Sequence, residues 1–152
     1  MKIIVDGNDG VGKTTLAKKL QEYFNIKSYM HLSAKDPRNF NFYYHILFKE
    51  DIIFDRSFMD EIIYSKVLKR TCMLTEYEDV TLHDTVKNNK IIVIICHTNN
   101  KKYSYSEASA IIAGEYEIDN YFFELSKKYN YIYFNPKEDS FKSLIEEITS
   151  SS

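Results

Sequence analysis

Glycine, lysine and threonine near the amino terminus follow a spacing suited to phosphate binding. Residues 7–14 read Gly-Asn-Asp-Gly-Val-Gly-Lys-Thr and satisfy the pattern G-x-x-x-x-G-K-[ST]. Glycine lets the backbone turn with positive φ, so that N–H groups approach phosphate oxygens. In this pattern the lysine reaches the β- and γ-phosphates and the hydroxyl binds Mg²⁺, which assigns those roles to Lys13 and Thr14. The pattern therefore predicts a site for a nucleoside triphosphate.

The pattern has this meaning only between a strand and a helix, and both are expected here. Residues 2–6 form an apolar run that ends at glycine, which is typical of a buried parallel strand. In residues 14–24, Leu16, Leu20 and Phe24 recur at helical spacing. The residues expected to surround the phosphates are Asn8, Asp9, Gly10, Val11, Gly12, Lys13, Thr14 and Thr15.

Short apolar runs alternate with segments of helical period along the rest of the chain. Further strands are expected at residues 28–32, 51–55, 90–96 and 131–134. Further helices are expected after Pro37, around residues 59–67, and at residues 76–88, 106–129 and 140–148, with Gly114 as a candidate interruption. Strands that alternate with helices imply a parallel sheet covered on both faces. We therefore expect an α/β three-layer sandwich with a five-stranded parallel sheet.

Length and charge limit the functions to consider. The chain has 152 residues and a net charge of −2, from 20 Lys+Arg against 22 Asp+Glu. That length suits one domain, expected at residues 1–149 with a frayed tail at 150–152. The charge balance argues against a protein that coats nucleic acid, so nucleic acid is not an expected partner.

Membrane insertion and disulfide bonding are also not expected. The longest apolar run, Ile91–Cys96, is too short to span a bilayer. The amino terminus lacks the apolar run and the cleavage site of a signal peptide. Cys72 and Cys96 lie far apart without metal-ligand spacing, which fits a reducing compartment. We expect a cytoplasmic protein.

Two motifs resemble those of thymidylate kinases. The loop at residues 7–15 carries an acidic residue, Asp9, where that family often has one. Asp55-Arg56-Ser57 ends the third expected strand as an Asp-Arg-(Tyr/His/Ser) motif does in that family and as Glu-Arg-Ser does in deoxynucleoside kinases. Less specifically, Tyr64 matches an aromatic residue at the same spacing, and Asp36-Pro37-Arg38 resembles a segment that receives the acceptor's phosphate. The chain resembles a short member of these phosphate-loop kinases.

The resemblance implies ATP- and Mg²⁺-dependent phosphoryl transfer, with Lys13, Asp55 and Arg56 as catalytic residues. Mg²⁺ would be held by Thr14 and Asp55. Arg56 would clamp the acceptor's phosphate or the transferred group with its planar fork of donors. The residues that the acceptor would contact are Asp9, Arg38, Phe42, Arg56 and Tyr64. For Arg56 a surface ion pair is the alternative, and for the aromatic residues it is packing in the core.

The nature of the acceptor depends on the groups near the second strand. A nucleoside needs a carboxylate base to take the proton of its 5′-hydroxyl, whereas a monophosphate is already anionic. In deoxynucleoside kinases this base looks like the glutamate of a Glu-Pro pair at the end of the second strand. This chain offers only Asp36 there, as a displaced substitute. With Arg38 present, a (deoxy)nucleoside monophosphate is favoured, dTMP first. A deoxynucleoside, or a nucleotide or modified base within DNA, is the alternative.

Several features depart from the resemblance or remain outside it. The lid region, residues 97–110, has no arginine, and its cations are Lys101 and Lys102. Asp60 stands where the family often has serine. Arg70 is interpreted as a complement to a helix dipole. The histidines are expected to be structural or exposed; they are His31, His45, His83 and His97. A homodimer is expected from the resemblance alone.

Two functions outside the kinases are weighed against this interpretation. Asn99-Asn100-Lys101-Lys102 follows a strand as the guanine-specificity motif of a GTPase would, but the required aspartate is tyrosine at position 103. An ATPase that serves assembly is the other alternative, and the chain shows no appended interaction segment for it. Release of ADP with water alone would favour these NTPase interpretations.

Overall fold

The fold is built on a five-stranded parallel sheet. The structure, a computed structural model, describes residues 1–98 and 109–151. Its strands are β1 (Lys2–Gly7), β2 (Ser28–His31), β3 (Ile52–Asp55), β4 (Ile92–Cys96) and β5 (Ile132–Phe134). They are hydrogen-bonded in the order β2-β3-β1-β4-β5, and every pair is parallel. The expected α/β class is therefore confirmed, and each expected strand is found within two residues of its predicted bounds.

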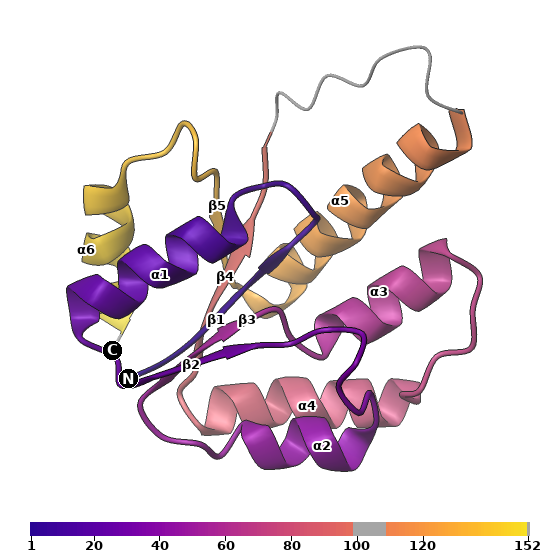
Figure 1. The fold of residues 1–152 in the computed structure, drawn as a ribbon, viewed down its shortest axis with the longest axis horizontal. Helices are drawn as coiled ribbons and strands as arrows, with labels where there is room; N and C mark the ends of the chain where they lie inside the picture. The colour runs from indigo at the N-terminus through magenta and orange to yellow at the C-terminus, as the bar shows by residue number, and fades with distance from the viewer. Residues whose placement is uncertain (99–108, 152) are drawn as a thin grey trace.

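Helices cover both faces of the sheet (Figure 1). They are α1 (Lys13–Phe24), α2 (Phe40–Ile46), α3 (Met59–Val67), α4 (Glu76–Asn88), α5 (Ser109–Tyr129) and α6 (Phe141–Ser151). On one face, Ile3 and Val5 of β1 pack in a core with residues of α1 and α6. On the other face, Ile4 packs in a core with residues of α2, α3, α4 and α5. This alternation follows from the two-residue period of a strand and gives the three layers.

Two helices differ from their expected extent. Helix α5 is continuous from Ser109 to Tyr129, so Gly114 does not interrupt it. Helix α6 continues through Ser151, and the hydroxyl groups of Ser150 and Ser151 both donate hydrogen bonds to the carbonyl oxygen of Glu147. These two serines therefore do not form the frayed tail that composition suggests.

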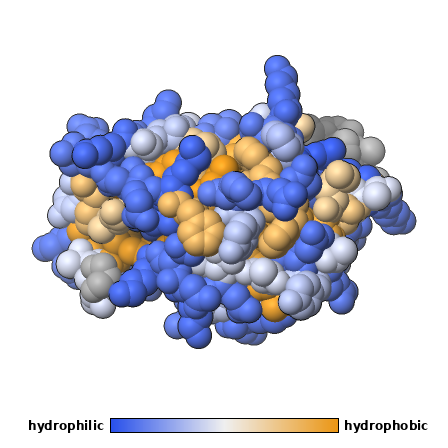
Figure 2. All heavy atoms as spheres, turned by 90° about the horizontal axis from the view of Figure 1, so that it is seen from below, coloured by the Kyte–Doolittle hydropathy of each residue, from blue (hydrophilic) through white to orange (hydrophobic). Residues whose placement is uncertain are grey.

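Two features concern contacts with membranes and with other proteins: the apolar length of the helices and the apolar side chains on the surface. Within residues 1–98 and 109–151, no helix combines the length and the apolar character needed to cross a bilayer. Figure 2 views the molecule from the side where α2 and α4 lie and shows apolar patches between hydrophilic side chains. Exposed apolar residues on these elements include Tyr44 of α2 and Val80 of α4. Pairing of two copies through helices stays a prediction.

The sheet order brings the two predicted motifs together. Strand β1 lies between β3 and β4, and Val5 pairs with Asp55. The carboxyl ends of parallel strands share one edge of the sheet, which is where ligands bind in open α/β folds. The loop after β1 and the Asp55-Arg56 pair after β3 are therefore neighbours at that edge.

Candidate active site

The loop between β1 and α1 has the backbone that its glycines predict. Gly7, Gly10 and Gly12 have φ values of 139°, 73° and 93°. A Cβ on Gly7 would lie 2.3 Å from the carbonyl oxygen of Cys96, so the neighbouring strand leaves no room for a side chain. Helix α1 begins at Lys13 directly after Gly12, which has no side chain to cap it. Its first N–H groups can therefore bind an anion.

Lys13 and Asn8 shape the inside of this loop. Lys13 is buried, and its Nζ donates a hydrogen bond to the carbonyl oxygen of Asn8. The Asn8 side chain is 2% exposed, and its Oδ1 accepts from the Tyr64 hydroxyl at 3.3 Å, while its Nδ2 donates to Asp119 Oδ1 at 3.1 Å. Asn8 thus ties the loop to α3 and α5 through its side chain. Thr14 and Thr15 are exposed on the first turn of α1.

Asp55 accepts three hydrogen bonds on one oxygen. Its Oδ2 receives the hydroxyl groups of Thr14 at 2.6 Å and Tyr29 at 2.5 Å and lies 3.0 Å from His31 Nδ1. Burial alone would raise the pKa of Asp55, but these hydrogen bonds and the His31 ring hold it below its usual value. Asp55 is therefore a carboxylate, fixed beside α1, the helix that follows the loop.

The second oxygen of Asp55 suits a metal ion. Among the described residues, the buried Oδ1 has no hydrogen-bond partner. Within residues 1–98 and 109–151, no group of three or more His, Cys, Asp or Glu side chains is arranged so that it could hold a metal ion. Mg²⁺ in phosphoryl-transfer sites is typically bound by one or two protein groups together with phosphate and water oxygens. Thr14 and Asp55 have the chemistry and the proximity for that arrangement.

Tyr29 and His31 are contributions of β2 that the sequence analysis missed. They alternate with Met30 and so point to the same side of the strand, and His31 pairs in register with Asp55. The interpretation of His31 as merely structural or exposed was incomplete, because its ring contacts the carboxylate. The two-residue spacing on a predicted strand was the available signal.

Arg56 is held between the loop and α3. Its backbone has φ of 79° and donates to the Val5 carbonyl oxygen at 2.9 Å. The guanidinium forms an ion pair with Asp9 through Nη2 and donates from Nη1 to Asp60 Oδ2 at 3.1 Å. The two ends of the fork are thus held by carboxyl groups, one on the exposed Asp9 and the other on Asp60.

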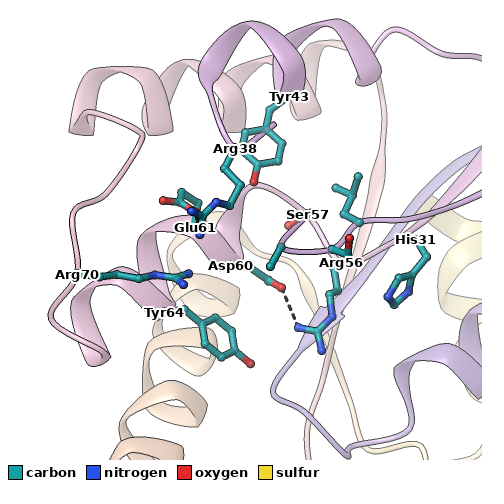
Figure 3. A pocket seen from close by; sticks show the side chains of 12 residues that line it. His31, Arg38, Tyr43, Arg56, Ser57, Asp60, Glu61, Tyr64 and Arg70 are labelled. Atoms are coloured by element: carbon teal, nitrogen blue, oxygen red, sulfur yellow. Dashed lines mark hydrogen bonds and ion pairs between the residues drawn. The ribbon is translucent and has the colours of Figure 1, made fainter. Parts of the chain in front are cut away.

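A pocket of about 380 Å³ opens beside Arg56 (Figure 3). All three arginines of the chain line it. Its lining residues are His31, Leu32, Ser33, Ala34, Arg38, Tyr43, Arg56, Ser57, Asp60, Glu61, Tyr64 and Arg70. Arg38 and Tyr64 are thus brought together with Arg56 in one lining, and their contact with an acceptor stays a prediction. Arg70 is not only a complement to a helix dipole, because its side chain reaches the same cavity.

Of the aromatic residues expected to contact the acceptor, Tyr64 lines this pocket and Phe42 does not. Phe42 is not among the lining residues and packs against the core next to Tyr43, with ring centroids 5.6 Å apart. Tyr43 faces the pocket instead. Neighbouring residues on a helix point about 100° apart, so the phase of a helix decides which aromatic ring faces the pocket. Lys101 and Lys102 of the expected lid lie outside the described residues.

The carboxyl groups of Asp6 and Asp60 lie close to each other next to Arg56. Asp6 is fully buried, and its Oδ2 accepts the Ser57 hydroxyl at 2.5 Å. Burial, and then the neighbouring Asp6, raise the pKa of Asp60 well above its usual value, although Arg56 opposes the shift. Asp60 therefore holds a proton more readily than an ordinary aspartate, and in that form it contributes no negative charge to the pocket.

Two solved structures are similar to this chain over nearly its whole length. The YorR protein from Bacillus subtilis, solved in complex with phosphorylated GDP, is similar with a TM-score of 0.75 and 20% identity, over 99% of this chain and 94% of that one. Deoxyadenosine kinase from M. mycoides, solved with bound dATP, is similar with a TM-score of 0.52 and 22% identity, over 99% and 98%. Neither a protein-family model nor a curated protein sequence matches this chain. The chain therefore has the expected nucleoside-kinase type of fold.

Proposed function

We propose that this protein transfers the γ-phosphoryl group of ATP to a (deoxy)nucleoside monophosphate, with dTMP as the first acceptor to test. The observation that supports this most strongly is the meeting of all three arginines in one pocket, beside a loop with a phosphate-binding sequence. A guanidinium binds phosphate oxygens through two parallel hydrogen bonds. Three such groups around one cavity favour an anionic acceptor.

Each part of the transfer has residues suited to it. The loop amides, the first turn of α1 and the Lys13 ammonium would hold the phosphates of ATP. Arg56 lies between this loop and the pocket, so its fork would stabilise the charge of the group in transfer. When bound, Mg²⁺ would be held by Thr14 and Asp55 and would neutralise charge on the β- and γ-phosphates. Catalysis would then rest on positioning and electrostatics.

A nucleoside acceptor is the second candidate, and Asp60 is the observation that favours it. The neutral 5′-hydroxyl has to lose its proton to a base. Asp60 lines the pocket, and its raised pKa moves it toward the range in which a general base works. Asp36, the substitute suggested by the sequence, instead accepts a hydrogen bond from the Ser33 amide at 2.8 Å.

Replacement of Arg56 tests the proposal. We expect Arg56→Ala to lower kcat/KM for dTMP by about 10³-fold, because the group in transfer loses its guanidinium. Binding of ATP is expected to change little, since Lys13 and the loop are intact. Arg56→Lys, which keeps the charge but loses the fork, should be intermediate. Coupled ADP release with dTMP and with thymidine measures these effects, and normal turnover of dTMP by Arg56→Ala would contradict the assignment.

A further inference from the structure

Arg70 reaches the pocket because of how α3 ends. Lys69 adopts a left-handed conformation with φ of 51°, and the Arg70 amide donates to the Ser65 carbonyl oxygen at 3.0 Å. This is the pattern of a Schellman turn, in which the chain reverses directly after the helix. A residue other than glycine in this conformation costs about 1 kcal/mol. The turn directs the Arg70 side chain toward Glu61 and Tyr64, into the pocket (Figure 3).

Glu61 fixes the segment that follows Arg70. The Glu61 side chain is buried, and its Oε1 accepts the Met73 amide at 3.0 Å and the Ser65 hydroxyl at 3.3 Å. The Cys72 thiol lies 3.8 Å from the Glu61 carbonyl oxygen. One buried residue of α3 therefore holds the returning chain against its own helix, and this holds Arg70 at the rim of the pocket.

The other oxygen of Glu61, Oε2, lies near Arg38, which also lines the pocket. Among the described residues Oε2 has no hydrogen-bond partner, and the nearest cation is Arg38 Nη1 at 3.8 Å. A buried carboxylate without a cation is strongly unfavourable. Glu61 thus draws Arg38, from the segment before α2, to the same side of the pocket as Arg70, while Arg56 stands on the other side next to the loop (Figure 3).

We propose that Arg70 is an acceptor-binding residue that, with Arg38 and Arg56, surrounds the phosphate of the acceptor. Glu61 is its positioning residue. The inference rests on the function proposed above and adds a cation from a segment to which the sequence analysis gave no binding role. The lining holds three guanidinium groups and the carboxyl groups of Asp60 and Glu61, and Arg56 also pairs with Asp9 outside the lining. A phosphate dianion in the pocket would compete with these carboxyl groups for the guanidinium donors.

Arg70→Gln, compared with Lys69→Gln, tests the role of Arg70. The two variants lose the same charge at adjacent positions, and Lys69 is exposed and is not one of the residues that line the pocket. For Arg70→Gln we expect KM for dTMP to rise about 10- to 100-fold, as for the loss of a charged hydrogen bond. The KM for ATP and the KM for thymidine should stay within about twofold of wild type, as should every constant of Lys69→Gln.

The rise in KM should also be the same for dTMP, dCMP and dGMP, because all three share the phosphate. Calorimetry with each monophosphate alone should show the same loss of affinity. A loss that differs among the bases would overturn the assignment to phosphate, and so would an Arg70→Gln variant that behaves like Lys69→Gln. A wild-type protein that phosphorylates no monophosphate would instead contradict the proposed function itself.

Glu61→Gln tests the positioning role. Glutamine keeps an oxygen for the Met73 amide but removes the charge that faces Arg38. If Glu61 holds the arginines in place, the Arg70→Gln penalty in KM for dTMP should shrink in the Glu61→Gln background, which a double-mutant cycle measures. An unchanged penalty would show that Glu61 has only a structural role.

Discussion

Asp55 and Arg56 are adjacent in the chain, yet their side chains point to different parts of the site and contact different residues. Asp55 ends β3 and accepts hydrogen bonds from α1 and β2, whereas Arg56 turns toward Asp9 and Asp60. The positive φ of Arg56 marks the point at which the chain leaves strand geometry. A left-handed arginine is uncommon and costs free energy, which is typical of residues at functional sites. One strand end thereby places the proposed metal ligand, Asp55, next to the proposed phosphate clamp, Arg56.

Gly7 and Gly10 provide a test of the loop backbone. An added methyl group at Gly7 meets the Cys96 carbonyl oxygen, which β-pairing holds in place, whereas at Gly10 it meets open space. We expect Gly7→Ala to lower the free energy of unfolding by about 3 kcal/mol or more. Gly10→Ala should cost about 1 kcal/mol, from its positive φ alone. Urea denaturation compares the two variants, and equal losses would contradict the described contact between loop and β4.

Helices and strands were predictable where the pattern of apolar residues involves only residues close together in the sequence. The unbroken apolar runs of β1 and β4 and the i, i+4 spacing of α1 require only neighbouring residues, and the sequence placed them correctly. Tyr29, His31 and Arg70 were missed for a different reason. The contacts of Tyr29 and His31 depend on the register of β2 with β3, and the direction of Arg70 depends on the turn after α3. Neither the register nor the turn can be predicted from neighbouring residues alone. The loop at residues 7–14 could be proposed as a phosphate site because the residues of its pattern are contiguous.

The packing of His83 in α4 against Tyr129 and Tyr131 predicts an unusual pH dependence. His83 is buried, stacks on Tyr129 with ring centroids 3.9 Å apart, and lies 3.6 Å from Asp79. Burial, and then Lys128, lower the pKa of His83 to about 3, whereas burial raises the pKa of Asp79 to about 6. Both groups are therefore neutral in the folded protein near pH 5.

These two shifts act on stability with opposite sign. As the pH falls from 6 to 4, the unfolded chain protonates His83 but the folded one does not, so stability is lost. Over the same range the folded chain already holds a proton on Asp79 that the unfolded chain still lacks, so stability is gained. Asp79→Asn removes the second effect. Its free energy of unfolding should fall between pH 6 and 4 by about 1 kcal/mol per pH unit more than that of Asp84→Asn, an exposed control on the same helix. Parallel urea-denaturation curves for the two variants would contradict the assignment.

At the scale of the whole molecule, the order of strands creates the site. Strand β1 lies between β3 and β4, so the phosphate loop opens next to the carboxyl ends of both neighbours. The segments before α2 and after α3 then close the pocket on the β3 side. The likeness to YorR and to deoxyadenosine kinase extends over nearly the whole chain. The fold was thus predictable from the alternation of elements, whereas the converging arginines, at positions 38, 56 and 70, required the structure.

Transfer of label from γ-³²P-ATP tests the central claim most directly. Wild-type protein with Mg²⁺ and dTMP is expected to move the label to dTDP, and Lys13→Ala, which lacks the ammonium group on the phosphates, is not. The exposed Lys18→Ala on the same helix serves as a control and should act as wild type does. Label that appears only as inorganic phosphate, or that stays in ATP with every monophosphate and nucleoside offered, would contradict the account.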